Sequence, residues 1–116
     1  QLESDECMRR NLEMLVVTTN GISGRKLQEL GIAKGTTVQS VHFGKDLMSG
    51  FKTLVGGELT SYNEMMDNAR GIATQRMEAD AAGMGADAVV GVRYASSSVT
   101  QGAAEVMAYG TAVRFL

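Results

Sequence analysis

Residues 56–93 read GGELTSYNEMMDNARGIATQRMEADAAGMGADAVVGVR, and this stretch decides the fold, because it combines a glycine pair, a helix, a glycine stop and a buried strand. Ser61 and Glu64 form an S-x-x-E capping box, in which a hydroxyl and a carboxylate satisfy free backbone donors, so we expect the helix to begin at Ser61. Glycines are expected to mark its two ends: Gly56 and Gly57 before it, and Gly83 and Gly85 after it.

One side of this helix is expected to form its buried face, with apolar residues at three- and four-residue spacing. That face comprises Met66, Ala69, Ala73, Met77, Ala81 and Met84, flanked by Met65 and Ile72. Gly71 costs about 1 kcal/mol relative to Ala in mid-helix, and the simplest reason for it is the close approach of another backbone, in this chain or in another subunit. Because small side chains bury little apolar area, we expect a second copy of the chain to complete the burial.

Short strand-like runs surround the helix. A β-branched or alternating pattern predicts strands over 14–18, 36–43, 88–94 and 105–115, the last two being an antiparallel pair joined by a polar link. Arg25–Leu30 fits either a strand or one helical turn that Gly31 ends, and 45–55 fits a short amphipathic helix. The order predicts an α+β fold, a small antiparallel sheet packed on one long helix plus a short one.

Length and charge limit the class of protein. A chain of 116 residues fits one domain, assigned here to 13–116, while the polar residues 1–12 are expected to be an arm, an expression remnant or a link to missing sequence. Eleven Lys and Arg against thirteen Asp and Glu give a net charge of −2, which argues against nucleic acid as a partner. A membrane span is not expected, because no apolar run is long enough, and we expect a cytoplasmic protein.

Chemically reactive motifs are sparse. Gly83–Ala88 resembles a dinucleotide loop, but it closes a helix and opens a strand, which is the reverse of the required order. The single histidine, His42, and the single cysteine, Cys7, cannot supply a zinc cage or a catalytic triad by themselves. Glu58 follows the glycine pair and is the carboxylate of most interest, although an ordinary surface acid is the commoner case. His42 and Glu58 are therefore weak metal-ligand candidates, and no cofactor is expected.

Two further patterns have structural explanations. Asp67 with Arg70, and Arg76 with Asp80, have the spacing of surface ion pairs on a helix. Thioethers can hold soft ions such as Cu(I), but the helical methionines are better explained as core.

Several segments, in the same order, resemble the YbjQ-like family of small bacterial proteins. These are VVTTNGISG at 16–24, GKDLMSGFKTLV at 44–55, GGEL at 56–59, ARGIATQRM at 69–77 and GADAVVGVRY at 85–94, and the resemblance covers 14–115. It implies a dodecin-like α+β subunit assembled into a ring of five copies, together with a heavy-metal-binding label. Ile22-Ser23-Gly24 departs from the Ile-Pro-Gly that is typical of the family, which affects the rigidity of that turn.

Three functional interpretations follow. The leading one is a non-catalytic homo-oligomer, a binding or assembly protein in which Gly56, Gly57, Ser61, Glu64, Gly71 and Gly85 have structural or interface roles. The alternative is a metal or small-ligand binder that uses carboxylates such as Glu58, brought together by symmetry. The third is an enzyme with an active site at an interface, which would require a buried carboxylate with a raised pKa.

Overall fold

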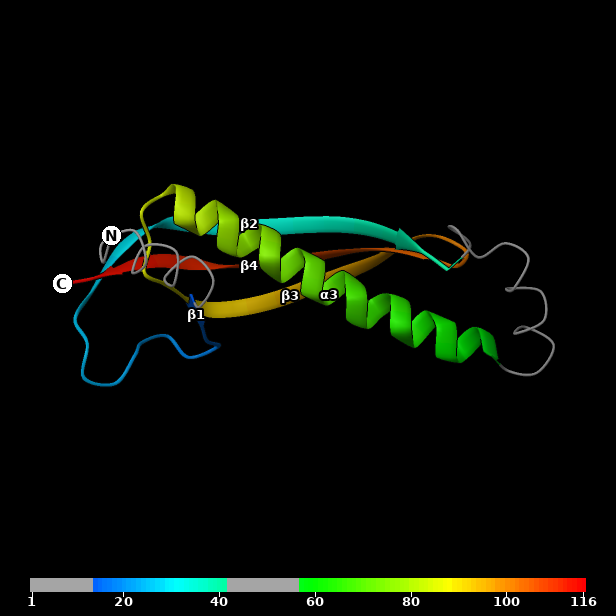
Figure 1. The fold of residues 1–116 in the computed structure, drawn as a ribbon, viewed down its shortest axis with the longest axis horizontal. Coiled ribbons are helices and arrows are strands. Elements are labelled where there is room, and N and C mark those ends of the chain that lie inside the picture. The colour runs from blue at the N-terminus through cyan, green and yellow to red at the C-terminus, as the bar shows by residue number, and fades with distance from the viewer. Residues whose placement is uncertain (1–13, 42–56) are drawn as a thin grey trace, which may run out of the picture.

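The computed structural model describes residues 14–41 and 57–116, with the side chains of 57–60 outside that description. Its elements are β1 (Leu15–Val16), β2 (Leu27–Ser40), α3 (Gly57–Gly83), β3 (Ala88–Thr100) and β4 (Ala103–Phe115). They form one four-stranded sheet in the order β1-β3-β4-β2, with α3 lying across one face (Figure 1). The α+β prediction is confirmed. The sheet is mixed rather than antiparallel, because β1 runs parallel to β3. The expected arm at 1–12 and the short helix at 45–55 lie outside the described residues.

Strand β2 is longer than the sequence indicated. It unites the ambiguous run before Gly31 with the predicted strand after it, so Gly31 does not end an element. Gly31 has a φ of 146°, and the pairing with β4 shifts register between Glu29 and Gly31. A glycine tolerates this backbone conformation, and the strand therefore bulges and continues.

The hairpin of β3 and β4 confirms the predicted antiparallel pair but shortens its link. The polar run 95–100 was assigned to the link, yet it pairs with β4 as far as Thr100↔Ala103. The turn is only Gln101-Gly102, with a φ of 75° at Gly102. Small hydroxyl side chains are compatible with a strand once a partner strand supplies the backbone bonds, and local composition does not reveal that partner.

Helix α3 ends as predicted and begins earlier than predicted. At its end, Ala86 N donates to Ala81 O (3.1 Å) and Gly85 N donates to Ala82 O (3.0 Å), with a φ of 83° at Gly85, which is a Schellman motif. At its start the helix extends back to Gly57, so the prediction that Ser61 is the N-cap is wrong. The S-x-x-E residues lie in the second turn of the helix, and Met65, which follows them, packs on Val41.

The core lies between α3 and the sheet. The buried helix residues are Met65, Ala69, Ala73, Met77 and Ala81, so the predicted face is largely confirmed. Met66 is only half-buried and Met84 is 37% exposed, which corrects the expectation for these two. Small residues allow the helix to approach closely. A Cβ at Gly35 of β2 would lie 2.3 Å from Ala73 O and 2.3 Å from Met77 N.

The close approach thus occurs at Gly35 and not at Gly71. A Cβ at Gly71 would meet no atom within 4 Å among the described residues, so within 14–41 and 57–116 no other backbone approaches it. The expectation that another subunit approaches Gly71 stays a prediction.

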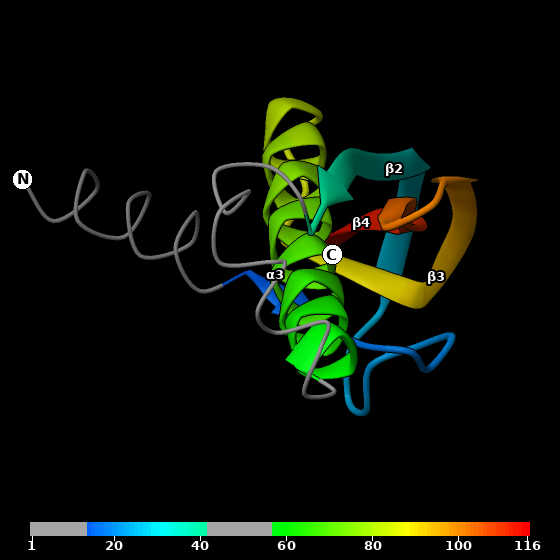
Figure 2. The same ribbon diagram turned by 90° about the vertical axis from the view of Figure 1, so that its right-hand side faces the viewer.

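The molecule is elongated, with extents of 55 × 32 × 21 Å. Element length explains this shape, since a strand of 14 residues spans about 46 Å at about 3.3 Å per residue. Figure 2 shows α3 on one side of the sheet only. The opposite face is covered near one end, where Val17, Ile22 and Leu27 pack on Ala88, Val90 and Val113. None of the described helices is long and apolar enough to cross a membrane.

Candidate functional site

Within 14–41 and 57–116, nothing covers most of the sheet face opposite α3, and we call it the open face. Successive side chains of a strand point to opposite faces of the sheet. The paired residues Gly35 and Ala108 face the helix, so their neighbours Lys34 and Tyr109, which are also paired, lie on the open face. Its members are Ile32, Lys34, Thr36 and Val38 of β2, Glu105, Met107, Tyr109 and Thr111 of β4, and Arg93, Ala95 and Ser97 of β3.

Apolar side chains on the open face are accessible to solvent. Ile32 is 70% exposed, Val38 57% and Tyr109 38%. The guanidinium of Arg93 is held in place, because its Nη1 donates to Thr18 O (3.1 Å) and to Val92 O (2.9 Å). Along β2, Lys34 and Thr36 separate Ile32 from Val38, so the open face is a mixed surface on which exposed apolar side chains alternate with polar ones.

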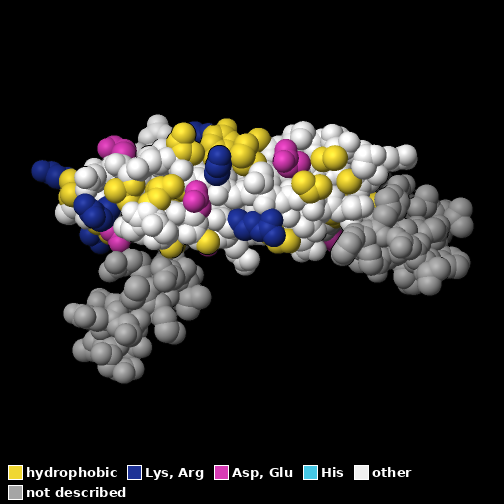
Figure 3. All heavy atoms as spheres, turned by 90° about the horizontal axis from the view of Figure 1, so that it is seen from above, with side chains coloured by type: hydrophobic (Ala, Val, Ile, Leu, Met, Phe, Trp, Pro, Cys, Tyr) yellow, Lys and Arg dark blue, Asp and Glu magenta, His cyan; other side chains and the backbone are white. Residues whose placement is uncertain are grey.

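The outer edge of β2 is bonded by side chains from α3. Arg76 Nη1 donates to Thr36 O at 2.7 Å, and Lys34 N donates to Asp80 Oδ2 at 3.0 Å. The sequence suggested that Arg76 and Asp80 form a surface pair, but the structure shows that each binds the backbone of the edge strand. The other predicted pair is confirmed, with Arg70 Nη2 at 2.6 Å from Asp67 Oδ1. Figure 3 shows this upper side of the molecule, where hydrophobic and charged side chains are interspersed.

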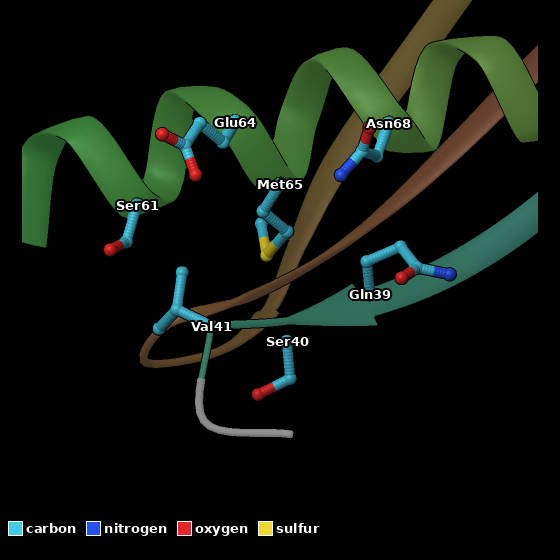
Figure 4. Close-up of a pocket in the computed structure, with 7 residues that line it drawn as sticks. All are labelled: Gln39, Ser40, Val41, Ser61, Glu64, Met65 and Asn68. Carbon is cyan, nitrogen blue, oxygen red and sulfur yellow. The ribbon is translucent and has the colours of Figure 1, made fainter. Parts of the chain in front are cut away.

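A pocket of about 140 Å³ lies between the end of β2 and the first turns of α3 (Figure 4). Met65 points toward Val41 at its apolar side, and the polar groups around it come from both elements. Its lining residues are Gln39, Ser40, Val41, Ser61, Glu64, Met65 and Asn68. Ser61 and Glu64, predicted as a cap, therefore belong to this pocket. One carboxylate with hydroxyl and amide groups suits a small polar ligand.

The remaining residues singled out in the sequence are placed as follows. Gly57 is the first residue of α3. Glu58 lies in its first turn with its side chain outside the description, while Gly56, His42 and Cys7 lie outside the described residues. Met65 and Met77 are buried in the core, as the packing interpretation predicted. Within 14–41 and 57–116, no three His, Cys, Asp or Glu side chains gather as a metal site would require.

Two features escaped the sequence reading. Burial raises the pKa of the Glu78 carboxyl above its ordinary value of 4.5. Thr74 Oγ1 donates to Arg70 O (2.7 Å) and lies 2.7 Å from Tyr94 Oη. Because the Thr74 hydroxyl has one proton, and that proton goes to Arg70 O, the Tyr94 hydroxyl is the donor to Thr74. Neither contact follows from helical spacing, since each depends on how α3 is placed over the sheet.

Comparison with known proteins agrees with this architecture. A family described as "Putative heavy-metal-binding" (YbjQ_1) matches residues 14–116. UPF0145 proteins are similar in sequence: the one from Alkaliphilus metalliredigens is 61% identical and covers 89% of this chain and 100% of its own. Relatives from Thermus thermophilus and Methanosarcina acetivorans are 56% and 52% identical, each over 89% of this chain and over 91% and 98% of their own.

A solved structure shows a related fold. It is a protein of unknown function of the DUF74 family from Pediococcus pentosaceus, with a TM-score of 0.57 at 16% identity, covering 89% of this chain and 98% of that one. At this identity the likeness concerns the fold alone. The family match over 14–116 and the UPF0145 relatives show that the chain belongs to the YbjQ-like family of UPF0145 proteins.

Proposed function

We propose that the protein is a non-catalytic, homo-oligomeric binding or assembly protein of the cytoplasm, whose copies associate through the open face. The observation that carries this proposal is the exposure of Ile32, Val38 and Tyr109 on a sheet that α3 covers on one side only. A dodecin-like subunit in a ring of five copies is the arrangement that the family resemblance suggests.

The physical argument is that a single chain leaves its apolar surface incompletely buried. Burial contributes about 25 cal/mol per Å² of apolar surface removed from water. Seven of the twelve buried residues in the core beneath α3 are alanines, which provide little such surface, while Ile32 and Val38 stand exposed on the other face. Association of sheets hides those side chains and compensates for the small core.

Sedimentation velocity tests this proposal directly. At micromolar concentration the wild-type chain is expected to sediment as a discrete species several times its mass of 12.3 kDa. A single species at the mass of one chain over the whole concentration range would contradict it.

A second candidate is a binder of a metal ion or a small polar ligand at sites repeated around the assembly. Two observations favour it: the description of the matched family and the pocket that contains Glu64. Symmetry would multiply single carboxylates, such as Glu58 or Glu64, into rings of oxygen ligands.

Native mass spectrometry during titration with divalent ions tests this second candidate. Bound ions in integer proportion to the number of chains, lost in Glu58→Gln or Glu64→Gln, would support it. Absence of bound ions, or binding unchanged in both variants, would remove it. Gln75→Glu is the control, because it changes the charge of an exposed residue of α3 that does not line the pocket.

A further inference from the structure

The pocket between the end of β2 and the first turns of α3 carries one charge. Glu64 is the only ionisable residue among those that line it, and none of the lining residues is basic. No other described residue forms a salt bridge or a hydrogen bond with the Glu64 carboxylate. The pocket therefore holds a negative charge that the described part of the chain does not neutralise.

The spacing along α3 explains why Glu64 lies at this pocket. Side chains four residues apart lie on one flank of a helix. Arg76 and Asp80 use that flank to bind the backbone of β2. Asn68 and Glu64 continue the same row toward the start of the helix, so they lie beside the last residues of β2. Figure 4 shows both on the wall that α3 forms, opposite Gln39 of β2.

The uncharged polar groups of the pocket add hydrogen-bond acceptors. Gln39 Nε2 donates to Thr37 Oγ1 at 2.8 Å, which uses one amide proton and fixes the amide, so the amide oxygen still accepts. Ser61 contributes a hydroxyl and Asn68 an amide, and each of these can accept a hydrogen bond. One carboxylate among neutral acceptors favours a ligand that has a positive charge and several donors.

The apolar side and the size of the pocket restrict the ligand further. Met65 and Val41 pack together there, and their side chains suit a stem of methylene groups. The volume is about 140 Å³. A cavity of about 150 Å³ holds benzene, so a ligand of about six non-hydrogen atoms fits. A divalent ion suits the site less well, because Ca²⁺ takes about six to eight oxygen ligands and the pocket has a single carboxylate.

We propose that this pocket binds a primary ammonium group on an unbranched alkyl stem. The ammonium donates to the Glu64 carboxylate and to the amide oxygen of Gln39, while the stem lies against Met65 and Val41. The inference rests on the second candidate function, in its small-ligand form, and names the chemical class of the ligand. A free amine and the lysine side chain of another protein share this chemistry.

Methyl NMR of the full chain, with carbon-13 in the methionine methyl groups, tests this proposal with n-butylammonium as the probe. The Met65 signal is expected to shift saturably, with a dissociation constant on the order of 1 mM for a ligand of this size. Met77, buried in the core, and Met84, near the end of α3, are internal controls that do not shift. n-Butanol has the same number of non-hydrogen atoms without the charge, and it is expected to bind about tenfold more weakly or less.

A pair of variants isolates the charge. Glu64→Gln keeps the size of the side chain, and it is expected to weaken n-butylammonium binding about tenfold or more. Asp67→Asn is the matched control, because Asp67 is an exposed carboxylate of α3 that does not line the pocket, and binding is expected to stay unchanged. Unchanged binding in Glu64→Gln, or equal weakening by the two variants, would overturn the proposal. If Glu64→Gln fails to fold, the comparison of n-butylammonium with n-butanol on the wild type decides.

The outcomes separate this inference from the proposed function. Equal affinity for n-butylammonium and n-butanol, or shifts that do not saturate, would overturn the ammonium site. Divalent ions that bind where the amine does not would overturn it and leave the second candidate function intact. Absence of both kinds of binding contradicts both, and self-association is measured independently by sedimentation.

A lysine whose amino and carboxyl groups are blocked as amides separates the two sources of the ammonium group. Binding of this probe as tight as that of n-butylammonium supports the site and identifies a lysine side chain as a ligand that it accepts. Binding of n-butylammonium alone supports the site and identifies a free amine as its ligand.

Discussion

Gly35 is the residue on which the packing of helix against sheet depends most directly. An added Cβ would lie 2.3 Å from backbone atoms of two successive turns of α3, Ala73 O and Met77 N. Backbone atoms cannot rotate away as a side chain can, so the helix would have to move as a unit.

Gly35→Ala is therefore expected to lower the free energy of unfolding by about 3 kcal/mol, near the upper end of overpacking effects. Urea denaturation followed by circular dichroism measures this. An unchanged midpoint would show that α3 can shift without cost.

Gly71→Ala is the matched control, since the same added methyl meets no atom of the described residues within 4 Å. Here the higher helix propensity of Ala is expected to raise the free energy of unfolding by up to about 1 kcal/mol. The opposite sign, measured in the assembled protein, would place a neighbouring subunit against Gly71.

Sequence reasoning at this scale succeeded where the cause is local. Gly85 was assigned from its place after a helical pattern, and its positive φ in a Schellman motif confirms it as the stop. Gly35 was not singled out, because its role arises from α3, at least 20 residues away in the chain, and no local signal marks the contact.

At the scale of elements, α3 has a different chemical role along each of its flanks. Arg76 and Asp80 bind the edge of β2, while Thr74 accepts a hydrogen bond from Tyr94 of β3. The helix thus connects to β2 along one flank and to β3 along the other, as well as to the core.

Removing one of the bonds to the β2 edge should have two effects. Asp80→Ala deletes the acceptor for Lys34 N and is expected to cost about 1 kcal/mol of unfolding free energy. It also frees an edge group for pairing, so light scattering on concentration should rise.

Asp67→Ala is the control for the loss of a helical carboxylate. The partner of Asp67 is Arg70, on the exposed surface, and an exposed pair contributes only a few tenths of a kcal/mol. Equal scattering from the two variants would contradict the edge-blocking role of Asp80.

Glu78 makes stability depend on pH. Burial raises its pKa above 4.5 in the folded chain, so the folded state holds this proton more tightly than the unfolded state does. The contribution of this proton to the free energy of unfolding is fully present below the pKa of Glu78 in the unfolded chain. It is lost as the pH rises through the pKa in the folded chain. Glu78→Gln removes that loss.

The unfolding free energy of Glu78→Gln, relative to the wild type, is therefore expected to increase between about pH 4 and about pH 7. Paired urea titrations across this range measure it. A difference that stays constant or decreases with rising pH would show that Glu78 is not disfavoured as a carboxylate in the folded chain.

The extents of the strands could not be read from the sequence because pairing overrides local preference. The run 95–100 looks like a link, yet β4 supplies its hydrogen bonds. In β2, Gly31 looks like a stop, yet its bulge is absorbed by the register shift opposite Ala112. The candidate pocket shows the same limit, since Ser61 and Glu64 were recognised together but as a cap.

At the scale of the whole molecule, the question is how an elongated sheet that α3 covers on one face only is stabilised. The open face was not apparent from the sequence, because both faces of the predicted strand at 36–43 looked mixed. The expectation that the chain is incomplete alone came instead from its small-residue helix, and it stays a prediction that the open face now makes specific.

Val38→Lys tests the open face without disturbing the subunit. Val38 lies opposite Glu105, so the new ammonium finds an opposite charge within the same sheet. We expect self-association to weaken about tenfold or more, which corresponds to about 1.4 kcal/mol. Sedimentation equilibrium measures the change.

Gln75→Lys is the control, since it adds the same charge on the exposed side of α3. It is expected to leave the association constant unchanged. Equal effects of the two variants would indicate that net charge, and not the open face, controls assembly.

The four-residue spacing of the buried helix positions, from Met65 to Ala81, has a geometric result. Each step of four advances 40° beyond a full turn, so the line of contact winds around α3, and the helix runs obliquely over the strands (Figure 1). The first turns of α3 lie beside the end of β2, where Met65 packs on Val41, and later turns bind the β2 backbone at Thr36 and Lys34. Neighbours approaching the two ends of β2 would therefore meet opposite ends of one helix, which gives the subunit a built-in polarity.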